Sequence, residues 1–437
     1  MLKRKIYNEL KAWKDTPNHL PLIIKGCRQC GKTWLVQYFA QNNYKNVIYI
    51  NFFEIPNLST IFQGSLDIDN LTMLMSAQIP NCQFEAGNTA IILDEIQECP
   101  EARTSLKFFK LDGRYDVIAT GSLLGVKGFG TPKSIPVGYE TMLTMTPLDF
   151  EEFLWANGIT DKMITILKKC LTDEVPVPAA LHQRMRDLLL QYVVVGGMPA
   201  VVQNFVNNHN LEIVLGIQRN IVNSYEDDMV KYALNSEKIR IRKAFSSIPK
   251  QLAKENKKFQ YSVIEKRGTS AKFENSIEWI ETAGIIKRCF NLSAPELPLA
   301  GNAEENIFKI YMADTGLFVS MLEDGTQGDI MQGNLLTYKG AVFENLVGDF
   351  FGKMGRPLYY FRKDSGLEID FVIRYKGKAT LVEVKAKNGN AKSMRIVLAN
   401  QQKYHVEQGI KLADAQVGRV GNVLTLPIYM GAFLTEV

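Results

Sequence analysis

The chain has 437 residues, a length typical of about three domains. Hydrophobic residues make up 46% and charged residues 22%, which excludes a disordered chain, a collagen and a coiled coil. The formal charge of +5 is small for this length, so no basic field covers the whole molecule. The six cysteines are too few for a disulfide scaffold, and their spacing indicates a reducing compartment without a zinc site.

The first third of the chain alternates short apolar runs with helical stretches. A glycine-rich loop follows the first run, and a helix is expected over residues 33–40. Buried strands alternating with helices predict a parallel sheet that is covered on both faces. The expected strands are residues 20–25, 47–50, 89–93, 115–119 and 142–145.

From residue 147 the pattern becomes helical and then basic. Helices are expected over 148–156, 181–195 and 211–232, with a break at Gly196-Gly-Met-Pro199. Further on, apolar spacing predicts helices over 241–252 and 270–282, followed by strands at 284–290 and 308–312. Helices followed by a strand pair are the order of a winged helix-turn-helix.

The last section reads as a small α/β unit. The pattern predicts a helix over 341–351, then strands over 358–361, 368–373 and 379–385, a helix, and a strand near 424–430. The N-terminus lacks an apolar signal core, and the longest apolar stretch is too short to cross a bilayer. We therefore expect a cytoplasmic protein that does not enter a membrane.

The glycine-rich loop fits the phosphate-binding pattern G-x-x-x-x-G-K-[ST] in full. The two glycines let the backbone approach phosphates, and the N–H groups at the start of the following helix form an anion site. Lys32 is expected to contact the β and γ phosphates of ATP, and Thr33 to bind Mg²⁺. The predicted nucleotide-binding residues are Gly26, Cys27, Arg28, Gln29, Cys30, Gly31, Lys32 and Thr33.

Two carboxylates follow the apolar strand at 89–93. Asp94 offers the oxygen ligand that Mg²⁺ prefers, and Glu95 is placed to orient or deprotonate the attacking water. Thr120 and Ser122 follow the fourth strand, where a hydroxyl either senses the γ-phosphate or caps a turn. Arg28 in the loop, Arg103 and Arg114 are candidate charge stabilisers, in cis or from a neighbouring subunit, and a solvated arginine is the alternative for each.

These motifs resemble those of AAA-type, additional-strand P-loop ATPases over residues 1–235. The runs Ser134-Ile-Pro-Val-Gly-Tyr-Glu140 and Thr146-Pro-Leu-Asp-Phe-Glu-Glu-Phe153 are similar to a bacterial and archaeal group that pairs this ATPase with an uncharacterised C-terminal domain. Gly196-Gly-Met-Pro199 and Ala313-Asp-Thr-Gly-Leu317 also match that group. The resemblance covers nearly the whole chain and implies ATP and Mg²⁺ as cofactors.

Three residues near the C-terminus reproduce the D…E-x-K arrangement of the PD-(D/E)xK nuclease fold. Glu383 and Lys385 lie two apart on one expected strand, so they share a face, and Asp370 on the preceding strand can join them. Asp370 and Glu383 are then candidate metal ligands, and Lys385 a stabiliser of developing charge. Glu344 resembles the additional acidic residue of that fold. A domain that docks without cutting is the alternative.

The basic charge is concentrated in two segments. Residues 236–290 hold 13 Lys and Arg against 6 Asp and Glu, and residues 353–403 hold 12 against 4. Such segments attract phosphate backbones, although solvated helix faces have the same composition. The candidate DNA contacts are Lys238, Arg240, Arg242, Lys243 and Lys254.

The sequence thus predicts four units of an α/β protein. They are an ATPase domain (1–147), a helical lid (148–235), a winged helix (236–325) and a restriction-endonuclease-like domain (335–437). The leading hypothesis is a Mg²⁺-dependent ATPase that acts on DNA or is regulated by it. The alternatives are a nucleotide-dependent protein-docking switch and an ATP-gated DNA nuclease. Protein partners and a homo-oligomer are both compatible with the sequence.

Overall fold

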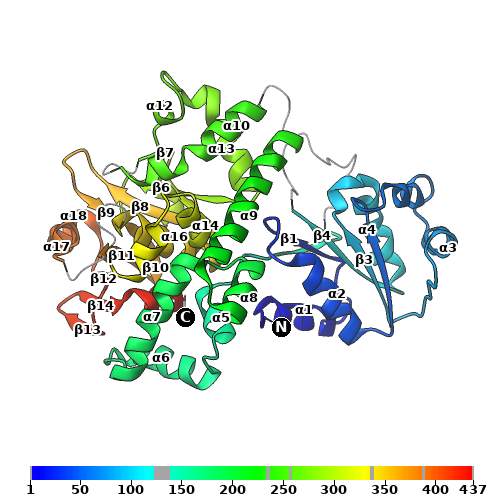
Figure 1. Cartoon of the computed structure of the whole chain (residues 1–437), viewed down its shortest axis with the longest axis horizontal. Coiled ribbons are helices and arrows are strands. Elements are labelled where there is room, and N and C mark those ends of the chain that lie inside the picture. Colours follow the sequence, from blue (N-terminus) through cyan, green and yellow to red (C-terminus); the bar gives the residue numbers. More distant parts are fainter. Residues whose placement is uncertain are drawn as a thin grey trace.

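A computed structural model describes residues 2–122, 138–232, 237–254, 258–334, 339–385 and 389–435. Residues 134–137 of the run that resembles the ATPase group lie outside these ranges. Figure 1 shows the N-terminal sheet on one side of the molecule and the C-terminal sheets on the other, with the long helix α9 (Leu211–Tyr232) between them.

The N-terminal sheet has five strands, all parallel, in the order β2-β3-β4-β1-β5. The prediction of a parallel sheet is confirmed, and each expected strand matches an observed one to within two residues. The additional strand, β4, lies between β1 and β3. The strands are β1 (Leu22–Lys25), β2 (Asn46–Asn51), β3 (Thr89–Asp94), β4 (Asp116–Gly121) and β5 (Thr141–Thr144).

Helices cover both faces of this sheet. Leu22 and Ile24 of β1 belong to one apolar cluster and Ile23 to another, because successive strand residues point to opposite faces. The sequence missed three of the four main helices here, since it predicted only the one after the loop. The helices are α1 (Ile6–Asp15), α2 (Lys32–Asn43), α3 (Ile68–Gln78) and α4 (Pro100–Asp112), with 3₁₀ turns η1 (Pro56–Phe62) and η2 (Ile96–Glu98).

Five helices follow β5. Asp149 caps the first of them with a capping box, in which its carboxylate accepts from the Glu152 N–H. The three expected helices are confirmed, and residues 161–173 and 199–208 form two more that the sequence analysis missed. The five helices are α5 (Phe150–Ala156), α6 (Asp161–Asp173), α7 (Ala179–Val195), α8 (Pro199–Asn208) and α9.

The basic segment folds into short helices and a strand pair. The helix expected over 241–252 is interrupted at Ser247, and Pro249, which lacks an N–H, lies in the first turn of the second helix. The elements are α10 (Lys238–Ser246), α11 (Ile248–Leu252), α12 (Tyr261–Ile264), α13 (Ser270–Thr282), β6 (Ile286–Leu292), η3 (Leu299–Asn302) and β7 (Ala303–Met312).

This strand pair continues into the C-terminal part of the chain. β6 pairs antiparallel with β7 and parallel with β8 (Leu358–Arg362), which in turn pairs with β9 (Glu368–Ile369). The sheet order is therefore β7-β6-β8-β9. Segments that the sequence analysis assigned to different units thus share one sheet.

The third sheet has the order β10-β11-β12-β14-β13. The single strand expected over 368–373 is wrong, because the chain leaves β9 at Asp370 and enters β10 at Phe371. The expected final strand ends at Pro427 and continues as the 3₁₀ turn η4 (Ile428–Phe433). The strands are β10 (Phe371–Tyr375), β11 (Lys378–Lys385), β12 (Gln408–Ala413), β13 (Gly418–Val420) and β14 (Val423–Pro427).

The helices of this part are α14 (Thr315–Ser320), α15 (Thr326–Met331), α16 (Lys339–Lys353), α17 (Lys392–Ala399) and α18 (Gln401–Tyr404). One apolar cluster extends from the helices after β5 through β7 and α16 to β14. It includes Tyr192, Phe245, Tyr311, Phe350 and Leu426, all nearly inaccessible. Helices α5 to α9, which the sequence analysis assigned to a lid, therefore share their core with the C-terminal part of the chain.

Two of the motifs behind the family resemblance pack on each other. The Gly197 N–H donates to Asp314 Oδ2 at 2.6 Å, and Asp314 also caps α14 through the Leu317 N–H. A Cβ at Gly316 would lie 2.5 Å from the nitrogen of Gly196, and one at Gly197 would lie 2.0 Å from the Leu148 oxygen. The glycines are required because these backbones touch.

Candidate functional site

The phosphate loop connects β1 to α2. A Cβ at Gly26 would lie 2.1 Å from the Met145 oxygen, and Gly31 has a φ of 94°, so both positions require glycine. The Lys32 ammonium folds back over the loop, donating to the oxygens of Gly26 at 3.0 Å and Cys27 at 2.9 Å. The start of α2 therefore presents backbone N–H groups and a lysine at one place, as an anion site requires.

Asp94, at the carboxyl end of β3, is the centre of a cluster of polar groups. The Thr33 hydroxyl donates to Asp94 Oδ2 at 2.9 Å, and the Tyr49 hydroxyl donates to the same oxygen at 2.7 Å. Thr120 donates to Asp94 Oδ1. The structure thus brings together the hydroxyl and the carboxylate that the sequence analysis assigned to Mg²⁺, and both supply the hard oxygen ligands this ion prefers.

Glu95 follows Asp94 in a left-handed conformation with a φ of 52°. Such a conformation is uncommon for a non-glycine residue, and strain of this kind is concentrated at functional sites. Gln97 donates to Glu95 Oε2, and the Ser122 hydroxyl lies 3.4 Å from the same oxygen. Thr120 and Ser122 therefore contact the two carboxylates directly.

Helix α9 contributes charged groups that the sequence analysis missed. The Arg28 guanidinium lies 2.8 Å from the Asp228 carboxylate, and the Tyr225 hydroxyl donates to the Arg28 oxygen at 3.1 Å. Burial raises the pKa of Asp228 to about 6, with Arg28 and Lys231 opposing the shift and Glu95 adding to it. The lid thus reaches the loop and the neighbourhood of Glu95.

Arg4 supports the loop from its other side, and it too was missed. The side chain is buried and donates to the oxygens of Cys30 at 3.2 Å and Thr146 at 2.5 Å, while Glu152 balances its charge. The only sequence signal was an arginine in an amphipathic segment. Arg4 thereby links the phosphate loop, the residues that follow β5, and helix α5.

The two loop cysteines contact each other. A hydrogen bond from Cys27 lowers the pKa of Cys30 to about 6, and the same bond raises the pKa of Cys27. Both thiols are buried. The two thiols therefore pack on the buried side of the phosphate loop, near Lys32.

The loop also borders the C-terminal part of the chain. A cavity of about 50 Å³ lies between Gly26 and Cys27 on one side and Gly284, Asp349 and Lys353 on the other. The loop therefore lies close to β6 and α16.

The C-terminal residues also converge, in part. Lys385 Nζ lies 2.9 Å from Glu383 Oε2, which confirms that the two share a face of β11. Asp370 Oδ2 accepts from the Val384 N–H at 2.8 Å, and Glu383 Oε1 accepts from the Met394 N–H at 2.8 Å. Burial opposes the charge of Lys385, but Asp370 and Glu383 outweigh it and raise its pKa.

Glu344, on α16 as expected, has a cationic partner that the sequence analysis missed. Lys309 of β7 lies 3.0 Å from Glu344 Oε1 and 2.7 Å from Glu368 Oε1, and its side chain is 1% exposed. The Tyr311 hydroxyl donates to Glu344 at 2.5 Å. Within the described residues, no group of three or more His, Cys, Asp or Glu side chains has the arrangement of a metal site.

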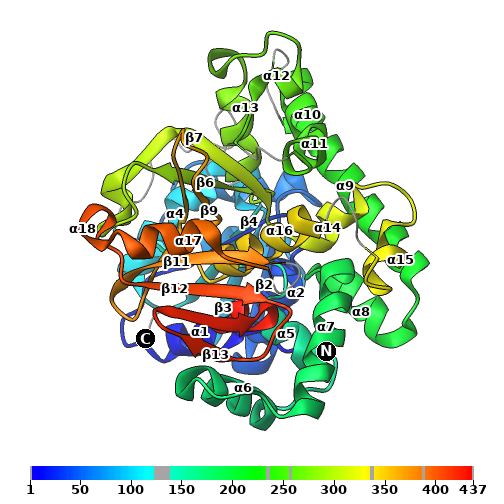
Figure 2. The ribbon, with the colours of Figure 1, turned by 90° about the vertical axis from the view of Figure 1, so that its left-hand side faces the viewer.

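The predicted DNA contacts lie on α10 and just beyond α11. Arg242 pairs with Glu226 at 3.0 Å, and Lys243 with Glu265 at 2.7 Å. Lys254 donates to the Gln260 side chain at 2.8 Å. Lys238 is half-buried, and Arg240 is exposed. Helices α10 and α11, which carry or precede these residues, lie toward one end of the molecule (Figure 2).

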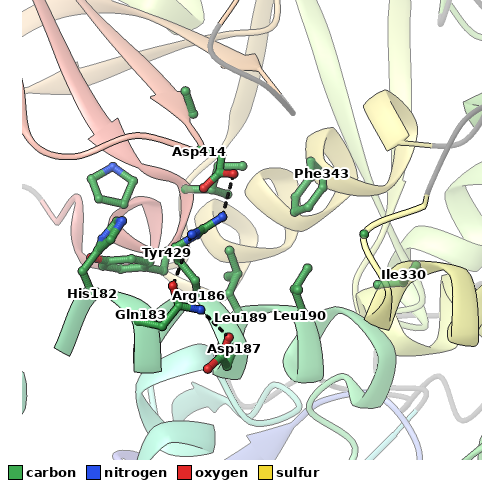
Figure 3. Close-up of a pocket in the computed structure, with 14 residues that line it drawn as sticks. His182, Gln183, Arg186, Asp187, Leu189, Leu190, Ile330, Phe343, Asp414 and Tyr429 are labelled. Carbon is green, nitrogen blue, oxygen red and sulfur yellow. Dashed lines mark hydrogen bonds and ion pairs between the residues drawn. The ribbon is translucent and has the colours of Figure 1, made fainter. Parts of the chain in front are cut away.

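A separate pocket of about 190 Å³ lies between α7 and the C-terminal sheet (Figure 3). Arg186 pairs with Asp414 at 2.8 Å, and His182 Nδ1 lies 2.8 Å from the Tyr429 hydroxyl. Burial lowers the pKa of His182. None of the lining residues belongs to the phosphate loop. The pocket is therefore part of the contact between α7 and the C-terminal sheet and is separate from the nucleotide site.

Comparison with known families assigns the N-terminal part. Residues 18–154, which span β1 to β5, match the model of an AAA domain. This segment is an AAA-type ATPase domain. The match and the phosphate loop together support ATP binding and ATPase activity. Residues 186–328 match a domain of unknown function, DUF8612, and residues 339–429 match another, DUF4143. No curated protein matches the chain.

Solved structures similar to the chain include three ATPases or nucleotide-binding proteins. The Walker-type ATPase paby2304 of Pyrococcus abyssi is 12% identical, with 74% of this chain and 96% of that chain covered and a TM-score of 0.42. AMPPCP-bound DnaA from Aquifex aeolicus is 13% identical over 63% and 86%, with a TM-score of 0.25. The signal-transduction ATPase PH0952 of Pyrococcus horikoshii is 13% identical over 81% and 45%, with a TM-score of 0.28.

No described helix is long and apolar enough to cross a membrane.

Proposed function

We propose that the chain is a Mg²⁺-dependent ATPase whose AAA domain controls a DNA-directed C-terminal part. The observation that carries the proposal is the convergence of Thr33, Asp94 and Glu95 beside the phosphate loop. Only β4 separates β1 from β3, so Thr33, Asp94 and Glu95 all lie near the carboxyl ends of these parallel strands. We keep the four units 1–147, 148–235, 236–325 and 335–437 as a proposed division of the sequence, although the last two share one sheet.

Each side chain has a definite task in hydrolysis. Lys32 and the N–H groups at the start of α2 hold the β and γ phosphates, which requires the lysine to leave the loop oxygens it now contacts. Thr33 and Asp94 hold Mg²⁺, which neutralises charge on the phosphates. Glu95 orients the water and accepts its proton, and Gln97 and Ser122 fix the carboxylate.

The loop contacts support a coupling of this site to the C-terminal part. Tyr225 and Asp228 hold Arg28 from α9, and the loop borders Gly284 and Lys353. A phosphate bound in the loop competes with Asp228 for the Arg28 charge. The lid and the C-terminal part share one core, so movement of α9 is transmitted to the latter.

The test of hydrolysis compares wild type with Glu95→Gln and, as a matched control, Glu54→Gln on an exposed loop. We expect Glu95→Gln to bind ATP with little change but to lose about 10²-fold or more of the turnover, since it removes the general base. Glu54→Gln should hydrolyse normally. Equal turnover in wild type and Glu95→Gln would reject the assigned role of Glu95.

A docking module without nuclease activity is the second candidate, and Lys309 favours it. In active PD-(D/E)xK-like chemistry the carboxylates must receive a metal, whereas Glu344 is already paired with a buried lysine. An active nuclease predicts Mg²⁺-dependent cleavage that Asp370→Ala abolishes. No cleavage in wild type, together with normal ATP hydrolysis, supports the docking module.

A further inference from the structure

Charge is divided unevenly within the helices after the lid. Residues 237–272 hold 11 Lys and Arg against 3 Asp and Glu. The rest of α13, residues 273–282, holds Glu274, Glu278 and Glu281 and no basic residue. In a winged helix-turn-helix, the helix in the position of α13 enters the major groove. Its acidic character opposes that role here.

The basic residues instead surround a groove. A hollow of about 430 Å³ lies between α10, α11 and α12, and its walls include Arg242, Lys243, Ser246 and Lys250. Arg242, Lys243 and Ser246 lie one, three or four residues apart on α10, and Lys250 of α11 lines the same hollow. Cations and a hydroxyl along one groove match the regular charges and oxygens of a phosphate backbone.

Ion pairs neutralise part of the charge of this groove but leave it positive overall. Glu226 balances Arg242, and Glu265 contacts both Lys243 and Lys272. Lys250 lines the groove, and Arg240 directly follows the lining residue Ile239 on α10. Both are exposed, and no carboxylate among the described residues forms an ion pair with either. Two charges are therefore available to a ligand without the loss of an existing contact.

The acidic side of α13 is held in place by its own contacts. Glu274 pairs with Arg288 at 2.6 Å and accepts from the Tyr261 hydroxyl, and Glu281 pairs with Arg288 at 2.6 Å. These contacts fix the carboxylates beside the wing strand β6. Arg288 balances one of these two carboxylates, so a phosphate backbone that approaches along α13 still meets net negative charge.

We propose that the α10–α12 groove binds the phosphate backbone of DNA without reading its sequence, and that α13 does not enter the major groove. The proposal rests on the proposed action on DNA and names its surface. Because the contacts are phosphate contacts, they give affinity and position but no base recognition. An acidic protein segment is the competing ligand for the same groove.

The test uses the full chain and a fluorescent 40-base-pair duplex of mixed sequence, with binding followed by anisotropy across a salt series. The variant is the double substitution Arg240→Gln and Lys250→Gln. Its matched control is Lys162→Gln and Lys169→Gln, at two exposed positions of α6. Helix α6 lies at the opposite end of the molecule from α10 in both Figure 1 and Figure 2. A third variant, Asn275→Ala, removes an exposed side chain of α13.

We expect the groove variant to bind on the order of tenfold more weakly, and the slope of log K against log salt to fall by about 2, one for each lost phosphate contact. The α6 control and Asn275→Ala should bind as wild type does. Thermal unfolding and ATP hydrolysis should be unchanged in all three, because none of these residues lies in the nucleotide site.

Three results overturn the proposal, and they are distinguishable. If wild type does not bind the duplex, the proposed action on DNA fails as well, whereas ATP hydrolysis is judged separately by Glu95→Gln. If wild type binds and the groove variant binds equally well, only the location is wrong. If polyglutamate displaces the duplex at equal charge concentration and itself binds more tightly, the groove takes an acidic protein segment instead.

Discussion

The guanidinium of Arg28, in the phosphate loop, lies 2.8 Å from the carboxylate of Asp228, in the last helix of the lid. The two residues are 200 positions apart in the sequence. Their contact joins the element that binds phosphate to the element that leads into the basic helices. The side chain of Arg28 is thus held by α9, and α9 packs in the same apolar cluster as the C-terminal part of the chain.

This contact predicts a pH effect whose sign follows from the pKa. Asp228 has a pKa raised to about 6, mainly by burial, so its charged form opposes folding even beside Arg28. The folded state then binds a proton that the unfolded state, with a pKa near 3.9, releases. Protonation of Asp228 therefore stabilises the folded state as the pH falls from about 7 toward 4. This contribution is lost as the pH rises through 6.

The measurement is the thermal midpoint of wild type and Asp228→Asn between pH 5 and 8. We expect the substitution to stabilise the chain by about 1–2 kcal/mol at pH 8, since the amide still accepts from Arg28, and the gain to shrink below pH 6. Asp227→Asn, at an exposed neighbouring position, should show no such trend. A gain that grows toward pH 5 would contradict the assignment.

Asp94 predicts a linked loss of stability and activity. Its two oxygens accept from Thr33, Tyr49 and Thr120 in a site that is 1% exposed. Asp94→Asn replaces one acceptor by a donor that faces hydroxyl groups, which should cost about 1–3 kcal/mol and abolish Mg²⁺-dependent hydrolysis. Asp116→Asn, at the other end of the sheet, is the control and should keep hydrolysis. Normal turnover in Asp94→Asn would remove this residue from the magnesium site.

Lys309 predicts a double-mutant effect. Burial opposes its charge, but Glu344 and Glu368 outweigh burial and raise its pKa above the ordinary value. Lys309→Met leaves these carboxylates without their cation, and the expected cost is about 3–5 kcal/mol in unfolding free energy. The double variant Lys309→Met with Glu344→Gln should recover part of that loss, because it removes the unpaired charge. Additive losses would show that the two side chains do not interact.

Two glycines predict opposite effects of the same substitution. A Cβ at Gly316 would lie 2.5 Å from the nitrogen of Gly196, so Gly316→Ala should separate α14 from the end of α7 and lower the melting temperature by several degrees. Gly216 lies inside α9 with open space around it, so Gly216→Ala should raise stability by about 0.5–1 kcal/mol. Equal effects at both positions would contradict the packing described here.

Local patterns were sufficient for the first sheet. Its three central strands, β3, β4 and β1, are almost fully buried, and a strand buried on both faces is apolar along most of its length. Gly26, Lys32, Asp94 and Glu95 were also proposed from the sequence as site residues, because the loop directly follows one apolar run and the carboxylates end another. Parallel pairing then brings those ends together.

Non-local pairing was beyond the reach of the same reasoning. The strand expected over 368–373 breaks at Asp370, and β6 pairs with β8 from a unit that was predicted to be separate. Strand pairing depends on contacts between residues that are distant in the sequence, and no local pattern records the partner. Lys309 had one signal, a lysine within the apolar run of β7, but its partners Glu344 and Glu368 could not be inferred from it.

The sequence by itself determined the phosphate loop, the adjacent carboxylates and the basic composition of residues 236–290. Only the tertiary structure decided which charges meet: Arg28 with Asp228, Lys309 with Glu344, and the cations of α10 and α11 around one groove. The physical reason is that motif residues follow one another along the backbone, whereas charge pairing is decided by distance in space. The chain's small net charge of +5 therefore says little about its surfaces, since positive and negative groups are sorted by the fold.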